Sequence, residues 1–251
     1  MRYAFITSTG RTGTDFFTYL FSEVIPNSWS QHEPKPAFRR RSYAYLSRQP
    51  SWYDEWYFRT SRQWFNLGKD KDWYIETNYH LFDATPLIRK VFPDALIVHI
   101  VRDGRQVVRS WLNRNRYITN DHITAFHLPG DPAQVVWNDW NPVQKLAWYW
   151  KTVNQQAKRL KPDLYLHFED IFKAEESAVF QILDAMPGIQ YDRDAVIAAL
   201  GHRVNSSRRD FFPHFEEWPT LWQQQFWEIA GEEMVAQGYI EQIPGSEERS
   251  A

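Results

Sequence analysis

The chain has 251 residues, 43% of them hydrophobic, and a formal net charge of −2 at pH 7. This length fits one large α/β domain as well as two small ones, and a charge so near zero provides no global field that would attract nucleic acid. The absence of cysteine excludes disulfides, thiolate metal sites and a cysteine nucleophile. No apolar run approaches the length of a signal peptide or of a membrane span, about 18 residues, so we expect a cytoplasmic protein without a membrane anchor.

Short apolar runs alternate with amphipathic stretches along the whole chain. Strands are expected at residues 3–8, 29–31, 73–77, 95–101 and 164–167. Helices are expected near 14–23, within 38–66, and at 86–91, 104–116, 142–160, 174–185, 194–200 and 220–237, with a loop at 117–141. This alternation predicts a parallel sheet covered on both faces. We expect one domain over residues 1–243 and a frayed tail over 244–251.

The first expected strand runs into a turn of small and hydroxyl-bearing residues, Thr7-Ser8-Thr9-Gly10-Arg11-Thr12-Gly13-Thr14. Glycines let backbone N–H groups turn toward one point, and the start of the next helix adds partial positive charge. With the hydroxyls and the Arg11 guanidinium, the turn forms a candidate anion cradle. A nucleoside-triphosphate loop would carry a lysine after its second glycine. Here Thr14 and Asp15 follow instead, which favours a less charged group; an ordinary strand-to-helix turn is the alternative.

A second candidate anion site follows the strand at 95–101. Arg102 comes directly after that strand, at the edge where open α/β sheets bind ligands. Ser110 lies eight residues later, about two turns into the next helix. An arginine fork and a hydroxyl at this spacing can hold one phosphate. The alternative is a helix capped by Asp103 with solvated arginines.

Together the two motifs resemble those of sulfotransferases that use 3′-phosphoadenosine 5′-phosphosulfate (PAPS). The glycine turn is similar to their 5′-phosphosulfate loop, and Arg102 with Ser110 is similar to their 3′-phosphate motif. The similarity runs from Tyr3 to about Tyr239 and implies a P-loop-like, three-layer α/β fold with a central parallel sheet of about four or five strands flanked by helices. The resemblance assigns donor binding to Gly10, Arg11, Thr12, Gly13, Thr14, Asp15, Arg102 and Ser110.

The chain departs from the cytosolic branch of this family in three places. That branch usually has lysine where Arg11 stands and threonine or serine where Asp15 stands. Arg11 can still hold the bridging oxygen of the donor, and Asp15 can favour the helix N-terminus. The branch also carries a late Arg-Lys-Gly element, which this chain lacks. In roughly that place stand Arg203, Asn205, Arg208 and Arg209, and from these we assign to the donor site Asn205, Arg208 and Arg209.

The second expected strand leads into the run Gln31-His32-Glu33-Pro34-Lys35-Pro36. Pro34 keeps Glu33 out of the helical region, so this segment should point into the same crevice as the other strand ends. Family members with a His-Glu-Pro or similar acidic motif here use the glutamate as catalytic base, and the resemblance carries that role to Glu33. His32 is the other candidate, because the cytosolic branch uses a histidine base. A solvated pair in a proline turn is the alternative.

Two further stretches are candidates for contact with the acceptor. Glu76 and Asn78 stand at the end of the strand at 73–77, where the family often carries polar residues that face the acceptor; a strand-end cap is the alternative. Residues 37–66 hold ten aromatic residues, six arginines and only two acids. This composition fits either a helix pair with inward aromatics and solvated arginines, or a cover that binds a sugar or an acidic acceptor.

The resemblance implies transfer of a sulfuryl group from PAPS to the hydroxyl of a sugar, phenol, lipid or other alcohol, with release of adenosine 3′,5′-bisphosphate (PAP). Glu33 would take the hydroxyl proton, and Arg11 would meet the negative charge that develops on the donor. No metal is expected, because a sulfuryl group carries less charge than a phosphoryl group. Two other functions remain open: a small-metabolite kinase, and a non-catalytic module that binds a nucleotide or a glycan.

Overall fold

The computed structural model describes residues 1–34, 50–115, 130–202 and 211–245. The chain divides into two compact units, the first formed by residues 1–101 and 156–206 and the second by residues 102–155 and 207–251. A single domain over residues 1–243 therefore stays a prediction. The expected tail falls, from residue 246 onward, outside the described residues.

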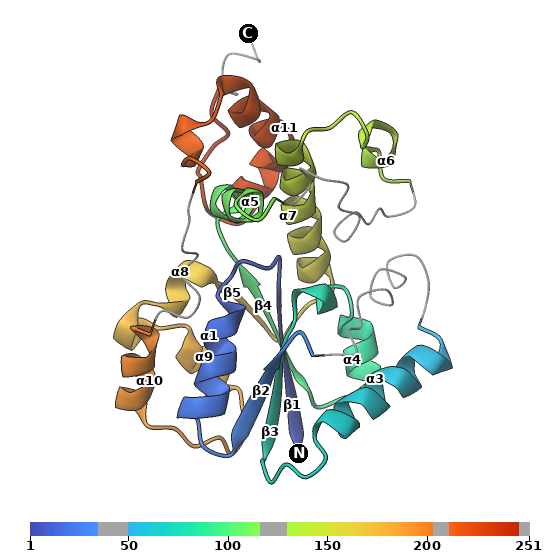
Figure 1. The fold of residues 1–251 in the computed structure, drawn as a ribbon, viewed down its shortest axis with the longest axis vertical. Coiled ribbons are helices and arrows are strands. Elements are labelled where there is room, and N and C mark those ends of the chain that lie inside the picture. Colours follow the sequence, from blue (N-terminus) through green and yellow to red (C-terminus); the bar gives the residue numbers. More distant parts are fainter. Residues whose placement is uncertain (35–49, 116–129, 203–210, 246–251) are drawn as a thin grey trace. The chain divides into compact units, whose positions relative to one another are not determined.

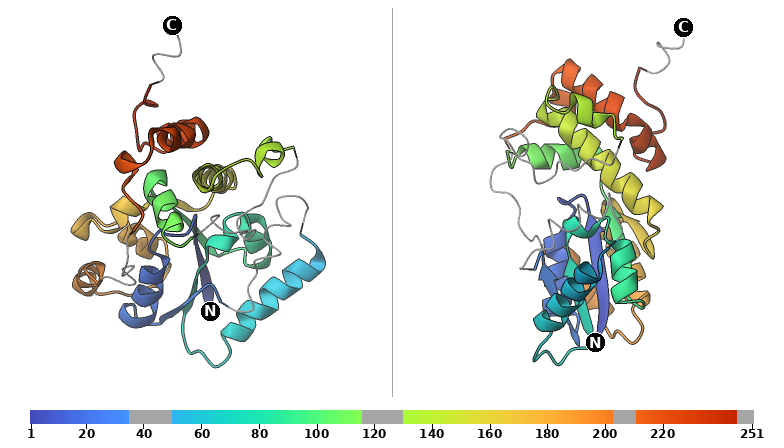
Figure 2. Two further views of the ribbon diagram at one scale, coloured as in Figure 1. Left: turned by 45° about the horizontal axis from the view of Figure 1, so that its top comes forward. Right: turned by 90° about the vertical axis from the view of Figure 1, so that its right-hand side faces the viewer.

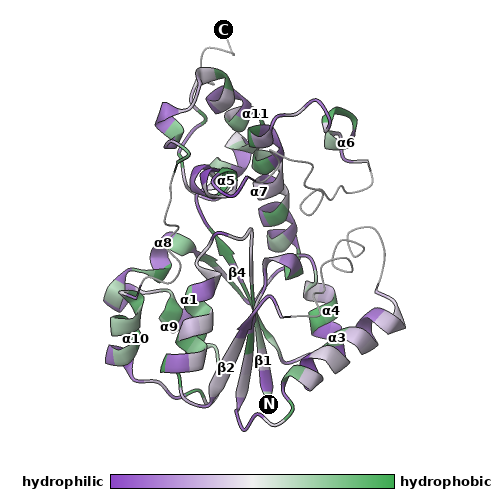
Figure 3. Cartoon of the chain, in the orientation of Figure 1, coloured by the Kyte–Doolittle hydropathy of each residue, from purple (hydrophilic) through white to green (hydrophobic). Residues whose placement is uncertain are grey.

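The first unit is built on a five-stranded sheet of order β2-β3-β1-β4-β5, in which all neighbouring strands are parallel. The strands are β1 (Arg2–Ser8), β2 (Ser28–His32), β3 (Trp73–Thr77), β4 (Leu96–Val101) and β5 (Leu164–His167). Each expected strand is confirmed to within one residue at either end. The clearest of them, β4, is hydrophobic apart from His99 (Figure 3) and buried at every position, as parallel strands covered on both faces are.

Helices cover both faces of this sheet. They are α1 (Thr14–Tyr19) with the π-helical turn η1 (Leu20–Val24), α3 (Trp52–Phe65), η2 (Tyr79–Leu81), α4 (Thr85–Val91), α8 (Phe168–Ile171), η3 (Ala174–Glu176), α9 (Val179–Asp184) and α10 (Arg193–Leu200). Local chemistry marks where several begin. Ser51 and Asp54 form a reciprocal capping box before α3, and Pro86 stands in the first turn of α4.

Alternate side chains of β1 point into two separate hydrophobic clusters. Ala4 and Ile6 pack with Phe17 of α1, whereas Phe5 packs with Phe58 of α3 and with the side chains of α4. Accordingly α1 and α3 lie on opposite sides of the sheet (Figure 1 and the left view of Figure 2). Burial of each large apolar side chain contributes roughly 1.5–3 kcal/mol to this three-layer packing.

In the described part of the second unit the regular elements are all helices. Its helices are α5 (Gly104–Leu112), α6 (Ala133–Val136), most of α7 (Pro142–Arg159), η4 (Phe215–Glu217) and α11 (Thr220–Ala236). Trp150 of α7 is fully buried, and a Cβ at Gly104 would lie 2.9 Å from its ring, so only glycine fits at the start of α5. Phe215 stacks edge to face on Phe226 of α11, with ring centroids 5.3 Å apart.

Two boundaries in the second unit differ from expectation. The helix expected over 104–116 ends at Leu112, and Asn115 adopts a positive φ of 55° that ends the turn beyond it. The loop expected over 117–141 contains the short helix α6, at whose start the Asp131 carboxylate accepts a hydrogen bond from the Ala133 N–H. An Asp-Pro pair before an apolar run is a helix-start signal. No helix in the described parts of the chain is long and apolar enough to cross a membrane.

Asp83, shortly before α4, is a buried carboxyl with no hydrogen bond to another described residue. Burial raises its pKa well above the usual range, and its own backbone N–H opposes the rise only in part. The folded chain thus keeps this proton to higher pH than the unfolded chain does. The resulting stability is fully present below the unfolded pKa of about 3.9 and is lost as the pH rises toward the folded pKa.

We therefore expect Asp83→Asn, which cannot ionise, to become more stable relative to the native chain as the pH rises from about 5 to about 8. The scale is on the order of 1–3 kcal/mol, the cost of burying an unpartnered polar group. Tm values of both chains across that range measure the difference. Asp94→Asn, at an exposed carboxyl of the same unit, is the matched control. A difference for Asp83→Asn that does not change with pH would contradict the assignment.

Candidate active site

Three neighbouring strands of the sheet, β1, β2 and β3, end at the same edge, and several of the predicted site residues follow directly after them. The glycine turn follows β1, Glu33 follows β2 and Asn78 follows β3. Two backbone hydrogen bonds tie these ends to one another: the Glu33 N–H donates to the Thr77 carbonyl and the Asn78 N–H donates to the Ile6 carbonyl, each at 2.9 Å. The carboxyl edge of a parallel sheet is where such folds bind their ligands.

The turn after β1 has the conformation that an anion cradle requires. Gly10, Arg11 and Gly13 all adopt positive φ, at 73°, 59° and 68°, and successive residues in this region turn their N–H groups inward. The Gly10 N–H donates to the Ser8 hydroxyl at 2.9 Å. At Gly13 a Cβ would lie only 2.9 Å from the Phe168 ring, so a side chain is excluded there by both space and backbone conformation.

The Thr12 hydroxyl is an unsatisfied polar group inside this turn. Thr12 is fully buried, and its Oγ1 has no hydrogen-bond partner among the residues that the structure describes. A buried hydroxyl without a partner costs on the order of 1–3 kcal/mol, which a bound anion would offset by accepting its hydrogen bond. The fit of the turn to an anion thus has support beyond the glycine spacing.

Beside the turn lies a cluster that joins α1, β2 and β3. The His32 Nε2 atom is 3.4 Å from Asp15 Oδ1 and 3.5 Å from Glu33 Oε1. On the other side of the ring, His32 Nδ1 is 2.9 Å from the Thr77 hydroxyl. Each of the three ionisable side chains is partly exposed, Asp15 and His32 by 33% and Glu33 by 23%. The structure therefore brings together both candidate bases and Asp15 of the glycine turn.

Glu76 lies on the face of β3 opposite to that of Thr77, and its side chain is completely buried. Arg62 of α3 donates to both of its carboxylate oxygens, at 2.6 and 2.9 Å, and the Asn78 side chain donates to it at 3.0 Å. The Tyr74 hydroxyl lies 3.3 Å from the same carboxylate, and burial, followed by the charge of Glu76, raises the Tyr74 pKa well above its usual value. The acceptor role of Glu76 and Asn78 stays a prediction; the geometry observed is that of a buried ion pair.

The aromatic and arginine-rich stretch is described only from residue 50 onward. On α3 the expected division of inward aromatics and solvated arginines is only partly correct: Phe58 and Phe65 are buried and Arg59 is exposed, but other residues depart from it. Trp52, Trp56 and Trp64 are exposed by 77%, 53% and 63%, whereas Arg62 is fully buried. Arg62 is stabilised there by Glu76 and by the Phe58 ring, whose centroid lies 4.0 Å from its guanidinium carbon.

In the second unit, Asp103 caps α5. This is what the alternative interpretation of the segment from Arg102 to Ser110 predicted. Its carboxylate accepts from the Arg105 N–H at 2.8 Å and pairs with the Arg105 side chain, an interaction that raises the Arg105 pKa. The Arg102 carbonyl accepts from the Trp150 indole at 2.9 Å, which anchors the backbone at the first residue of the motif. Arg102 and Ser110 are both partly exposed, and their role in binding a 3′-phosphate stays a prediction.

Several predicted residues lie outside the described part of the chain. They are Asn205, Arg208 and Arg209, together with Arg203, Lys35 and Pro36 at the edges of the two motifs.

Among the candidates from the sequence are Glu76 and Asn78 but not Thr77, which lies between them in the chain. Side chains alternate along a strand, and Thr77 shares a face with Trp73 and Ile75, which pack in the core cluster of α1. That alternation was the signal in the sequence that could have distinguished Thr77 from Glu76. It places the two side chains on different faces of β3, and Thr77 is recognised as the residue on the α1 side once the face that α1 covers is known.

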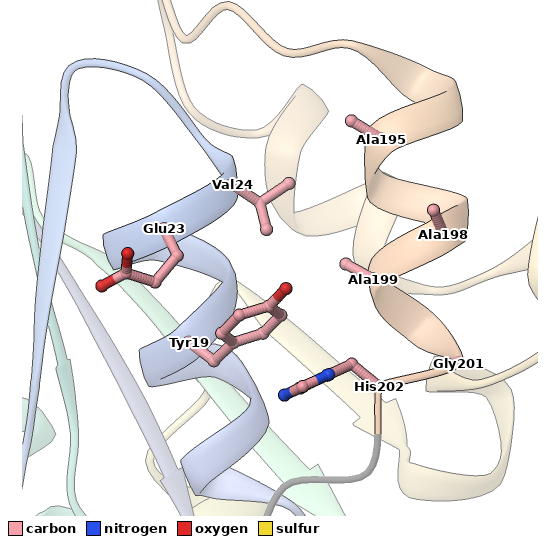
Figure 4. A pocket seen from close by; sticks show the side chains of 8 residues that line it. All are labelled: Tyr19, Glu23, Val24, Ala195, Ala198, Ala199, Gly201 and His202. Carbon is pink, nitrogen blue, oxygen red and sulfur yellow. The ribbon is translucent and has the colours of Figure 1, made fainter.

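A groove of about 710 Å³ lies between α1 with η1 and α10, and no predicted site residue lines it. Its lining residues are Tyr19, Glu23, Val24, Ala195, Ala198, Ala199, Gly201 and His202 (Figure 4). The His202 ring stacks on Tyr19 with centroids 4.4 Å apart. An aromatic platform beside a carboxylate is the chemistry that a ligand would meet there.

Comparison with known proteins agrees with the fold. A model of the sulfotransferase family matches residues 4–193. Similar solved structures include a sulfotransferase from Alicyclobacillus acidocaldarius, 12% identical over 96% of each chain with a TM-score of 0.51. Another is the sulfotransferase domain from the curacin biosynthetic pathway, 10% identical over 96% of this chain and 98% of that one, with a TM-score of 0.53. No curated protein matches the chain significantly.

The structural likeness, at such low identity, concerns the fold, and it confirms the expected α/β architecture with a central parallel sheet. The family match spans most of the chain and includes β1 from Ala4 onward, the other four strands, the glycine turn, Glu33, Arg102 and Ser110. The chain therefore belongs to the sulfotransferase family.

Proposed function

We propose that this sulfotransferase uses PAPS as donor and an alcohol hydroxyl as acceptor, with Glu33 as the base. The observation that carries the proposal is the joining of three strand ends in one unit. They bring together a glycine turn, in which the buried Thr12 hydroxyl has no partner among the residues described, and the cluster of Asp15, His32 and Glu33. The first feature suits an anionic donor. The second offers a carboxylate that can take a proton.

The residues of the turn fit a 5′-phosphosulfate group. Thr12 Oγ1 can donate the hydrogen bond that it lacks, and the start of α1 offers N–H groups and partial positive charge. Arg11 is proposed to lie at the bridging oxygen, and Arg102 with Ser110 to hold the 3′-phosphate. PAPS, when bound, supplies the sulfuryl group and leaves as PAP.

In the proposed mechanism Glu33 accepts the proton of the acceptor hydroxyl as that oxygen attacks. A base in position typically contributes about 10²- to 10⁴-fold to the rate. Arg11 and the N–H groups of the turn stabilise the negative charge that grows on the donor side. Glu33 is suited to this because its backbone is held by Thr77 and its side chain remains partly exposed at the sheet edge.

A thermal-shift measurement tests the donor. PAP at about 100 times its Kd should stabilise the chain by about 2.7 kcal/mol, which raises Tm by roughly 5–10 °C for a chain of this size. AMP, which lacks the 3′-phosphate, and ATP, the donor of a kinase, should give much smaller shifts at the same concentration. Equal Tm shifts with PAP and AMP would contradict the assignment of a 3′-phosphate site. A larger Tm shift with ATP than with PAP would favour the kinase.

Arg102→Ala tests whether the preference for PAP over AMP depends on Arg102. A hydrogen bond to a charged group contributes about 1.5–3 kcal/mol, so PAP affinity should fall roughly 10- to 150-fold while AMP affinity stays nearly unchanged. Arg114→Ala, at an exposed arginine of the same unit, is the matched control. A uniform loss for both nucleotides would indicate structural damage rather than a lost phosphate contact.

A further inference from the structure

A chain of hydroxyl groups determines which nitrogen of His32 carries a proton. The Thr18 Oγ1 atom lies 3.3 Å from the Thr14 carbonyl and 3.1 Å from the Thr77 Oγ1 atom, which in turn lies 2.9 Å from His32 Nδ1. A hydroxyl has one proton to donate, and a carbonyl oxygen can only accept. With Thr18 donating to the Thr14 carbonyl, Thr77 is the donor of the Thr18–Thr77 hydrogen bond. In this arrangement Thr77 has no second proton, so His32 donates its Nδ1–H to Thr77.

With Nδ1 committed as a donor, Nε2 is the ring atom that can gain and lose a proton. Nε2 stands between two carboxylates, 3.4 Å from Asp15 Oδ1 and 3.5 Å from Glu33 Oε1. In the opposite tautomer, with the proton on Nε2, a neutral ring could not take a proton from Glu33. The hydroxyl chain thus leaves the Nε2 lone pair facing Glu33 whenever the ring is neutral.

We propose that Asp15 and Thr77 are positioning residues of a proton relay that runs from Glu33 through His32 to Asp15. The relay deepens the proposed function and rests on it. Glu33 gains the acceptor's proton; its O–H bond then breaks as an N–H bond forms at Nε2, which gives the imidazolium. That N–H bond breaks in turn as Asp15 gains the proton, and Asp15 releases it to water. The ring returns to the Nδ1–H tautomer, and Glu33 is again a carboxylate for the next turnover.

The exposed fractions of the two carboxylates and the position of Asp15 agree with a relay that runs from Glu33 to Asp15. The Asp15 side chain is 33% exposed and that of Glu33 23%, so the relay leads from the less exposed carboxylate to the more exposed one. Asp15 occupies the second position of α1, directly behind the glycine turn, where its backbone is held by the helix. Asp15, at the position where the resemblance leads one to expect threonine or serine, thereby gains a role that those hydroxyl residues could not perform.

The tautomer can be measured without any substrate. In the chain labelled with ¹⁵N-histidine, the resonance of His32 is identified by its loss in His32→Gln. At a pH where the ring is neutral, Nδ1 should be protonated and Nε2 bare. Thr77→Val should abolish this preference, and Thr77→Ser should retain it because the hydroxyl is kept. A neutral ring with its proton on Nε2 in the native chain would overturn the proposal, whether or not the variants fold.

The relay itself is tested by Asp15→Asn in steady-state turnover with PAPS. We expect kcat to fall about 10-fold, less than the loss of the base itself because water can still take the proton. The KM for PAPS and the affinity for PAP should remain within about twofold, since the relay takes Asp15 out of the donor contacts that the resemblance assigned to it. In Asp15→Ala, where the truncated side chain leaves room for it, added formate, a small carboxylate, should restore part of the lost kcat in proportion to its concentration. Asp194→Asn, at the same second position of α10, is the matched control and should change nothing.

The outcomes separate the two proposals. A native chain that binds no PAP and transfers no sulfuryl group would overturn the proposed function. A native chain that turns over, with kcat unaffected by Asp15→Asn or a loss in Asp15→Ala that formate does not rescue, would overturn the relay alone.

Discussion

Glu33→Gln is expected to lower sulfuryl-transfer turnover by about 10²-fold or more, the low end of what a general base supplies. Glutamine keeps the size of the side chain but cannot accept the acceptor's proton. The affinity for PAP should not change, because the proposed donor contacts lie on the glycine turn, Arg102 and Ser110. The measurement is PAP release from PAPS, with an acceptor found by screening sugars, phenols, lipids and peptides, alongside direct binding of PAP.

Two comparisons make this result interpretable. Glu175→Gln, at an exposed glutamate of the same unit, should leave turnover unchanged. His32→Ala should reduce turnover less than Glu33→Gln does, because water can replace a relay more readily than it replaces the base. The reverse ranking would move the base to His32 and keep the reaction, and full activity in both variants would place the base elsewhere.

Arg62→Met is expected to destabilise the fold by about 3–5 kcal/mol, the range measured when one partner of a buried ion pair is removed. Arg62 and Glu76 are both 0% exposed, and two hydrogen bonds join them between α3 and β3. Without the guanidinium, the buried Glu76 carboxylate would keep, in the described part of the chain, the hydrogen bonds from Asn78 and Tyr74 alone. Urea unfolding, analysed for the free energy of unfolding and for its slope, measures the loss.

A double variant of the Arg62–Glu76 pair and a variant of an exposed ion pair serve as controls for this prediction. Arg62→Met combined with Glu76→Gln removes both charges and should recover much of the stability, because neutral pairs of similar volume replace buried ion pairs at little cost. Arg89→Met breaks the Arg89–Asp163 pair, whose side chains are 37% and 36% exposed, and should cost at most about 1 kcal/mol. Equal losses from Arg62→Met and Arg89→Met would contradict a stabilising role for the buried pair.

Glu76 also shows why the site could be predicted only in part. From the sequence, Glu76, Thr77 and Asn78 are equivalent polar residues at the end of a strand. The strand period establishes that Glu76 and Thr77 face opposite sides, yet nothing local indicates which side α1 covers and which side α3 covers. That assignment needs the sheet order, in which β3 lies between β2 and β1. The partners Arg62 and His32 are 14 and 45 residues away from Glu76 and Thr77, respectively.

The sequence by itself determined the succession of strands and helices, because the apolar runs, the glycines of the first turn and the prolines are local signals that act on the few residues beside them. It also supplied Glu33, His32 and the glycine turn as candidates, through motifs that are contiguous in the chain. The tertiary structure alone decided that the Thr12 hydroxyl is buried with no hydrogen-bond partner among the described residues, and that Arg62 is inside while three tryptophans of α3 are outside. It alone decided that Asp15, His32, Glu33 and Thr77 meet. These are contacts between elements distant in sequence, and they follow from strand order and packing, which no short stretch of residues encodes.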